Sequence, residues 1–153
     1  MANTQALTTS FKTEILSGIH ALGTTVIRAG TGADTLKAAL YLASATVNAS
    51  TTAYSATGEV TGSGYSAGGI TVTNANQPAN SGTTAYWTPS ASFTYTNVTL
   101  TTAFDAVLIY NSTQSDKAVS VHTFGSQTIT AGTFTLTMPA NTTSTALLRL
   151  ATT

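Results

Sequence analysis

The apolar positions near the start of the chain recur with the spacing of an α-helix. Ser10 is suited to the N-cap, Glu14 favours the first turn of such a helix, and Gly23 is suited to the position just after its end. The pattern therefore predicts a helix that begins after Ser10 and ends before Gly23. Four large apolar residues form a single stripe on it at i, i+4, i+8 and i+11: Phe11, Ile15, Ile19 and Leu22.

Two interpretations of this helix remain open. In the first, it is an ordinary helix that packs on its own domain. In the second, it is part of an amphipathic arm that docks on another subunit, and the polar lead-in Ala2–Thr9 is typical of such an arm.

From residue 35 onward the apolar period changes from about 3.6 toward 2, which indicates β-strands. The candidate strands are short, rich in Thr, Val, Ile and aromatic residues, and separated by clusters of Gly, Asn, Ser or Pro. For the first of them, a short helix is the alternative. About eight short strands of this kind, separated by turn-rich segments, predict a mainly β chain folded as an antiparallel β-sandwich. The first candidate is Leu36–Ala43, which the alternation predicts to be half-buried. The others are Ile70–Thr73, Ala85–Thr88, Ser92–Thr96, Ala106–Tyr110, Ala118–Phe124, Thr133–Met138 and Ala146–Leu150.

The chain thus divides into two unequal parts. Residues 1–34 are predicted to form an N-terminal arm with one α-helix, and residues 35–153 are predicted to form the β-sandwich domain. Half of the charged residues fall before residue 38, whereas residues 60–104 carry no charge at all.

The low charge of the chain narrows its possible functions. Only 7% of the 153 residues are charged, compared with roughly 25% in ordinary soluble domains, and the formal net charge is zero. No basic surface is therefore available to neutralise a phosphate backbone, so we expect no nucleic-acid binding. A 42% hydrophobic content with little charge is also unlike a disordered chain. A surface without net charge favours association, so we expect a homo-oligomer, a dimer or trimer.

Several other classes are excluded by what the sequence lacks. It has no cysteine, which rules out disulfides and a thiolate zinc site. No apolar stretch is long enough for a transmembrane helix, so we expect no membrane span, and no secretory signal is apparent. The two histidines, His20 and His122, have no second ligand at a metal-binding spacing, so we expect neither a metal site nor a cofactor.

One string imitates a catalytic motif. Gly64-Tyr-Ser66-Ala-Gly68 matches the G-x-S-x-G nucleophile elbow, which requires a strand before the serine and a helix after it. Here the pattern that follows, Ile70–Thr73, is that of a strand. We therefore interpret the segment as a loop whose glycines allow a positive φ and close backbone approach, and we expect that the protein is not an enzyme.

Tyr86 and Trp87 are the other candidates for recognition, because exposed aromatic rings can stack on sugars or bases. Adjacent residues of a strand point to opposite faces, so we expect one ring in the core and the other exposed or in an interface. The residues expected to form an interface are Phe11, Ile15, Ile19, Leu22, Tyr86 and Trp87.

The order of segments resembles a family of small virion structural proteins of tailed bacteriophages. Members show V-x-G-x-G-Y-x-A-G-G, then A-V-I-Y-N, a D-F-G turn and G-T-F-T-I near the end. In the third pattern Thr123 replaces the Asp of the family, and in the fourth Met138-Pro139 follows the match. The matching segments, spread over most of residues 35–150, are Gly58–Thr73, Phe104–Asn111, Lys117–Gly125 and Thr130–Pro139.

The resemblance implies a role in a phage particle assembled in the host bacterial cytoplasm. The expectation is a capsid decoration or cement protein that stabilises the head by binding between subunits of the major capsid protein. A tail, baseplate or fibre component of the virion is the alternative. From a different class, a carbohydrate-binding module that uses Tyr86 or Trp87 for host attachment is the other alternative.

Overall fold

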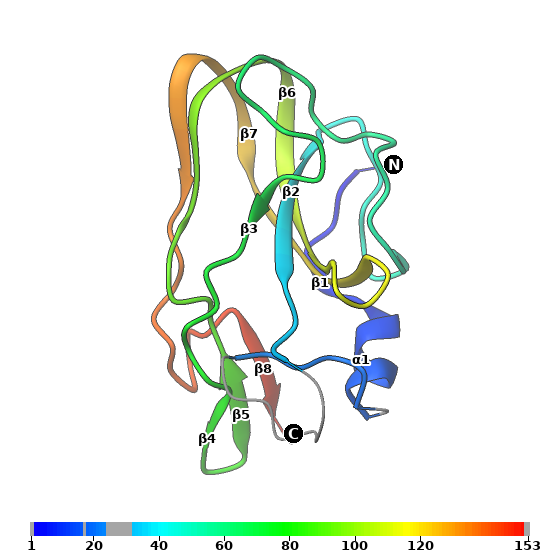
Figure 1. Cartoon of the computed structure of the whole chain (residues 1–153), viewed down its shortest axis with the longest axis vertical. Coiled ribbons are helices and arrows are strands. Elements are labelled where there is room, and N and C mark those ends of the chain that lie inside the picture. Colours follow the sequence, from blue (N-terminus) through cyan, green and yellow to red (C-terminus); the bar gives the residue numbers. More distant parts are fainter. Residues whose placement is uncertain (1, 17, 24–31, 152–153) are drawn as a thin grey trace.

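The computed structural model of the chain describes residues 2–16, 18–23 and 32–151. It contains a five-stranded sheet in the order β1-β7-β6-β2-β3 and a three-stranded sheet in the order β4-β5-β8, both antiparallel, with one short helix (Figure 1). The predicted mainly β fold, an antiparallel sandwich with an N-terminal arm and one helix, is confirmed. The elements are β1 (Ala6–Leu7), α1 (Thr9–Leu16), β2 (Leu36–Leu42), β3 (Ile70–Thr71), β4 (Ala79–Ser81), β5 (Thr84–Trp87), β6 (Phe93–Asn111), β7 (Lys117–Leu136) and β8 (Leu148–Ala151).

β6 and β7 form one long hairpin that folds over on itself. The sequence predicted four separate strands here; the structure joins them in pairs into strands of 19 and 20 residues. The register between β6 and β7 shifts repeatedly between Tyr95 and Ala106, and Figure 1 shows the paired ribbons turning over at the top of the view. Such irregularities bend a strand and increase its twist. The two halves of the hairpin therefore lie in different layers.

The main hydrophobic core fills the space between these layers. Residues from β2 and from the second half of β6, such as Leu40 and Ile109, belong to the same buried cluster as Phe93, Tyr95 and Phe134 of the folded-over half. The rings of Phe104 and Phe134 meet edge to face with centroids 5.0 Å apart, an arrangement that aromatic pairs favour.

A second cluster covers the opposite face of the same sheet. Ala39, Tyr41 and Leu108 are buried there together with Val47, which lies in the segment after β2. The three consecutive residues Ala38, Ala39 and Leu40 each have 0% exposure. β2 is thus buried on both faces, which explains a sequence that is apolar almost throughout.

The helix is shorter than the sequence predicted, and its caps are different. It begins at Thr9 because the Thr8 hydroxyl accepts the Phe11 N–H at 3.4 Å, so Thr8, and not Ser10, is the N-cap. It ends at Leu16 because Gly18 has a φ of +67°. The Gly18 N–H then donates to the Ile15 carbonyl, and the Ile19 N–H to the Glu14 carbonyl, the bonds that close a Schellman motif. The predictions that His20 is helical and that Gly23 follows the helix end were wrong, and Glu14 lies outside the first turn.

The N-terminal segment packs on the sandwich. β1 pairs with β7 through Ala6↔Val121 and Leu7↔Ser120, and the Thr8 hydroxyl donates to the Ala118 carbonyl at 3.0 Å. Phe11 is 1% exposed and belongs to the main core cluster. Of the two interpretations of the helix, the structure therefore matches packing on its own domain.

The glycine-rich segment between β2 and β3 is held by close backbone contact. A Cβ at Gly62 would overlap the Thr99 carbonyl oxygen, one at Gly64 the Asn97 oxygen, and one at Gly69 the Ala38 oxygen. The segment is anchored further by Glu59, which is 6% exposed. Its carboxylate accepts hydrogen bonds from the hydroxyls of two tyrosines and from a backbone amide: Tyr54 at 2.6 Å, Tyr65 at 2.7 Å and Gly68 N at 2.8 Å.

We predict that Gly69→Ala lowers the free energy of unfolding by about 3 kcal/mol or more. Gly69 has a φ of +71°, and the added methyl group would collide with the Ala38 carbonyl inside the sheet. Gly125→Ala is the matched control, because a Cβ there meets no atom within 4 Å. Urea unfolding of both variants checks the prediction. Equal stability of the two would contradict it.

We also predict that the folded chain loses stability as the pH rises above about 10. Burial raises the pKa of Tyr41 to about 12, and burial also raises the pKa of Tyr65 and Tyr95. Above pH 10.0, the ordinary tyrosine value, the unfolded chain releases these protons while the folded chain keeps them. Each such tyrosine lowers the free energy of unfolding by about 1.4 kcal/mol per pH unit until its own pKa in the folded chain is reached.

Urea unfolding at several pH values between about 9 and 12 measures this slope. The ultraviolet absorbance of tyrosinate, followed in native and in denatured protein, tests the cause independently. A free energy of unfolding that stays constant through that range would contradict the prediction.

Candidate functional site

Five of the six residues predicted to form an interface line one pocket. Phe11, Ile15, Leu22, Tyr86 and Trp87 all contribute to its walls. Ile19, the sixth, is half-buried and does not line the pocket. Residues separated by more than 60 positions in the sequence are thus brought together at the surface between the N-terminal segment and the small sheet.

The pocket has a volume of about 380 Å³ and mostly apolar walls. One wall is formed by α1 and the turn after it, and the other by β5 and β8, with Gln77 and Pro78 between them. Leu150, at 46% exposure the one large apolar side chain among the described residues that is classed as exposed, lies in the second wall. The pocket is therefore suited to an apolar group that enters from outside.

The two aromatic residues of β5 have different roles. Trp87 is 2% exposed, and its indole N–H donates to the Asn76 carbonyl at 3.0 Å. Tyr86 is half-buried. This agrees with the prediction that one ring lies in the core. It also leaves Tyr86 as the more accessible of the two rings for stacking on a sugar.

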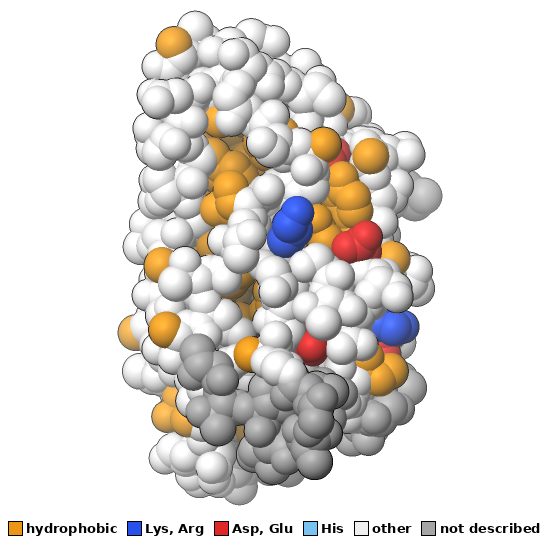
Figure 2. Space-filling view, in the orientation of Figure 1, with side chains coloured by type: hydrophobic (Ala, Val, Ile, Leu, Met, Phe, Trp, Pro, Cys, Tyr) orange, Lys and Arg blue, Asp and Glu red, His pale blue; other side chains and the backbone are white. Residues whose placement is uncertain are grey.

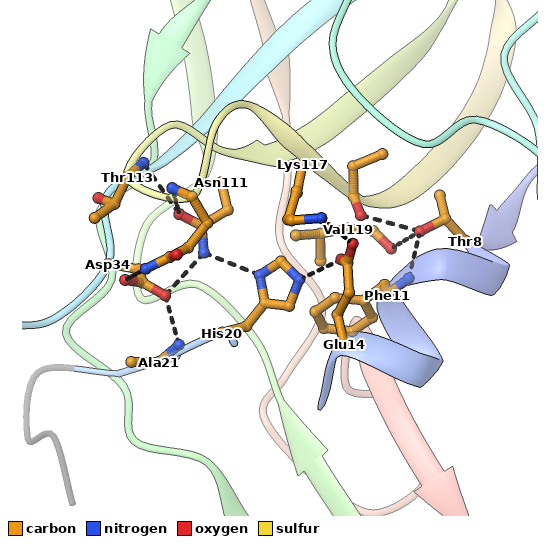
Figure 3. Close-up of polar contacts among 12 residues, drawn as sticks. Thr8, Phe11, Glu14, His20, Ala21, Asp34, Asn111, Thr113, Lys117 and Val119 are labelled. Carbon is orange, nitrogen blue, oxygen red and sulfur yellow. Dashed lines mark hydrogen bonds and ion pairs between the residues drawn. The ribbon is translucent and has the colours of Figure 1, made fainter. Parts of the chain in front are cut away.

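Behind the pocket lies a buried polar network centred on His20, shown in Figure 3. The His20 side chain is 0% exposed. Its Nε2 lies 2.8 Å from Oε2 of Glu14 on α1, its Nδ1 lies 2.9 Å from Nδ2 of Asn111 at the end of β6, and its ring packs on Phe11 at 4.8 Å between centroids.

Asn111 fixes the protonation of this histidine. The Asn111 Oδ1 accepts the backbone N–H groups of Thr113 and Gln114, so its Nδ2 must face His20. Nδ2 is a donor, and His20 Nδ1 is therefore the acceptor, while Nε2–H donates to Glu14. The same Nδ2 donates to Asp34 at 2.8 Å, and Asp34 also accepts the Ala21 N–H.

Glu14 completes the network through Lys117 at the start of β7. The Lys117 Nζ lies 2.6 Å from Glu14 Oε1. Burial opposes ionisation of Glu14, but the hydrogen bonds from Lys117 and His20 outweigh it, so the pKa of this carboxyl lies below its ordinary value. The network thereby ties the helix, the turn after it, Asp34 and the β6–β7 turn into one unit, and it supports one wall of the pocket.

His122 lies in a second cleft of about 510 Å³ between β1, β7 and β8, which shares Leu7 and Leu148 with the apolar pocket. Its Nε2 is 2.9 Å from the hydroxyl of Ser120, and burial lowers the pKa of His122 to about 4. This histidine is therefore neutral at physiological pH and a poor proton acceptor. Ser120 is 1% exposed and lines the same cleft.

The serine of the G-x-S-x-G string has no catalytic surroundings in the described part of the chain. Ser66 is exposed in a turn closed by the Gly69 N–H donating to its carbonyl, and the strand β3 follows it, as the sequence predicted. His20 and His122 make their hydrogen bonds elsewhere. Within residues 2–16, 18–23 and 32–151, no group of three or more His, Cys, Asp or Glu residues could hold a metal ion.

The helix Thr9–Leu16 is too short to cross a membrane, and no other helix in the described ranges is long and apolar enough to do so.

Sequence reasoning missed the polar network, because its members lie far apart in the chain. His20 and Asn111 are separated by 91 positions, and Asp34 and Asn111 by 77. The available signal was compositional: five of the ten charged residues precede residue 38 in a chain that carries few charges elsewhere.

We predict that Asn111→Ala lowers the free energy of unfolding by about 2–4 kcal/mol. The substitution removes the hydrogen bonds that the Asn111 side chain makes with the buried side chains of His20 and Asp34, and with the N–H groups of Thr113 and Gln114 at the β6–β7 turn. Asn80→Ala is the control, since Asn80 is an exposed residue of β4. Chemical denaturation measures both. A loss below about 0.5 kcal/mol for Asn111→Ala would show that the network contributes little to stability.

Comparison with known proteins adds no relative: no protein-family model, no curated protein and no solved structure matches the chain.

Proposed function

We propose that the protein is a structural component of a tailed-bacteriophage particle, a decoration or cement protein that binds between subunits of the major capsid protein. In this proposal it is not an enzyme and needs no cofactor. It stabilises the shell by mass action, because a protein that binds only the assembled lattice favours that lattice. The observation that carries the proposal is the apolar pocket between the N-terminal segment and the small sheet.

The pocket supports docking on a neighbouring protein. Apart from His20 and Gln77, its walls consist of apolar residues, glycine and two aromatic residues with one polar atom each. His20 already uses both ring nitrogens inside the network. An apolar side chain of a capsid subunit fits such a surface, because its burial removes apolar area from water without leaving polar groups unpaired.

The distribution of charge supports the same proposal. Three of the five acidic residues, Glu14, Asp34 and Glu59, are buried inside the chain. Figure 2 shows a face on which charged side chains are few and apolar patches lie among uncharged polar atoms. A surface of this kind is suited to being covered by neighbours in an assembly.

The segments that carry the family resemblance have structural roles here. Glycines of the Gly58–Thr73 segment allow it to lie against β2 and β6, and Phe104–Asn111 and Lys117–Gly125 form the buried half of the long hairpin. A role in assembly agrees with motifs that hold a fold together. A tail, baseplate or fibre position shares all these features, and copy number separates it from a capsid position.

We predict that Leu150→Ser weakens binding to the particle about tenfold or more, while Arg149→Ser leaves it intact. Leu150 lies in the pocket wall, and burying a leucine on binding contributes about 1.5–3 kcal/mol. Arg149 is the adjacent exposed residue of the same strand and does not line the pocket. The measurement is co-sedimentation of each variant with particles that lack the protein, followed by a gel of pellet and supernatant.

The same assay is run from low salt to about 1 M sodium chloride. Salt shortens the Debye length from about 10 Å at 0.1 M to about 3 Å at 1 M, so binding through apolar contact persists where binding through ion pairs fails. Release by moderate salt would assign attachment to Lys37, Lys117 or Arg28, the last of which lies outside the described residues. Gel densitometry of wild-type particles supplies the copy number, which we expect to be comparable to that of the major capsid protein. A far lower number would place the protein in the tail or a fibre.

A further inference from the structure

One edge of the large sheet has no partner strand in the described part of the chain. β1 covers β7 only at Ser120 and Val121, whereas β7 continues to Leu136 with β6 on one side alone. No other described strand pairs with residues 123–136. Figure 1 shows this part of β7, coloured orange, along the outer margin of the molecule.

The last part of this edge is a regular strand. Phe93↔Leu136, Thr94↔Thr135 and Tyr95↔Phe134 pair without a register shift. Ala131, with a φ of +46°, interrupts the strand just before this stretch. Thr133 and Thr135 are exposed, while Phe134 between them points into the core. Residues 134–136 therefore pair with β6 in regular register, and residues 132–136 present backbone groups along an accessible edge.

This edge lacks the protection that most exposed edges have. Natural proteins use charged side chains, proline or strong distortion to prevent such edges from pairing with other strands. Here no Lys, Arg, Asp or Glu occurs between Lys117 and Arg149, and residues 132–136 contain no proline. The exposed side chains are threonines, which favour strands and pair well with one another across them.

We propose that residues 132–136 of β7 form an antiparallel edge-to-edge contact with the same residues of a second copy of this chain. With the two-fold axis at Phe134, Thr133 of one copy lies opposite Thr135 of the other, and the same contact occurs twice. The large sheets of the two copies then continue into each other.

The observations favour a second copy over a foreign strand. The sequence Gly-Thr-Phe-Thr-Leu places threonine opposite threonine on the outer face and Phe134 opposite Phe134 on the core side when it is paired with itself. Because the edge is uncharged, self-pairing brings no like charges together. The side chains of Leu136 and Met138, which are partly buried against the core, lie at the end of the same edge and gain cover from the partner.

The experiment uses charges to test the register. The double variant Thr133→Lys/Thr135→Lys places like charges directly opposite each other, and we expect it to weaken self-association about tenfold or more. The variant Thr133→Lys/Thr135→Glu places Lys opposite Glu at both positions in this antiparallel register, and we expect it to associate at least as tightly as the unmodified chain. Analytical ultracentrifugation over a concentration series measures all three.

The control is Thr94→Lys/Thr96→Lys, which adds the same charge to exposed residues of β6, the strand on the inner side of β7. Circular dichroism establishes that each variant is folded. The proposal fails if the unmodified chain is monomeric at all concentrations. It also fails if the control weakens association as much as the Lys/Lys variant, or if the Lys/Glu variant is as weak as the Lys/Lys variant. None of these outcomes depends on attachment to a particle.

Discussion

The structure depends on a sheet that is buried on both faces. β2, the second half of β6 and the first half of β7 are covered on one side by the folded-over end of the hairpin and on the other by the segment that follows β2. A central slab of this kind has no face left for polar side chains, which is why Ala38, Ala39 and Leu40 are consecutive apolar residues. The N-terminal helix through Phe11, and the small sheet through Trp87 and Leu148, pack against the same core.

The sequence predicted local elements better than their connections. The position of β2 agrees with the strand predicted from alternating apolar residues, because period and composition act within a few positions. The prediction that this strand is half-buried was wrong, because clusters of other residues cover both of its faces. The folding-over of β6 and β7 was missed, because Gly125 and Gly132 were interpreted as breaks between separate strands, whereas both lie within the one bent strand β7. The helix was predicted too long for a related reason. Its apolar stripe continues to Leu22, but the residues after Gly18 reach the same core without being helical.

In the candidate site, too, local features were predicted better than contacts between distant residues. Large apolar residues converge wherever a chain buries its surface. Five of the six predicted interface residues therefore line one pocket, even though the helix that carries some of them is shorter than predicted. The polar network behind it depends on particular pairs, and no local pattern links His20 to Asn111 across 91 positions. The N-cap at Thr8 also depends on distant residues, because the Thr8 hydroxyl donates to the carbonyls of Ala118 and Val119. Apolar burial can be predicted from composition, whereas a hydrogen bond between distant residues requires the fold itself.

The burial of acidic groups bears on the association that we propose, because it leaves shape as the main determinant of a contact. Glu14, Asp34 and Glu59 are used to hold the N-terminal segment and the glycine-rich loop, so the surface carries even less charge than the composition suggests. Long-range electrostatics then contributes little to choosing a partner or rejecting a wrong one. What remains to specify a contact is short-range: apolar area in a pocket of defined shape and backbone hydrogen bonds along one uncovered strand. Contacts of these two kinds form only when the partners are already in register. In the proposed function, the regular lattice of the capsid would present the partner surfaces in that register.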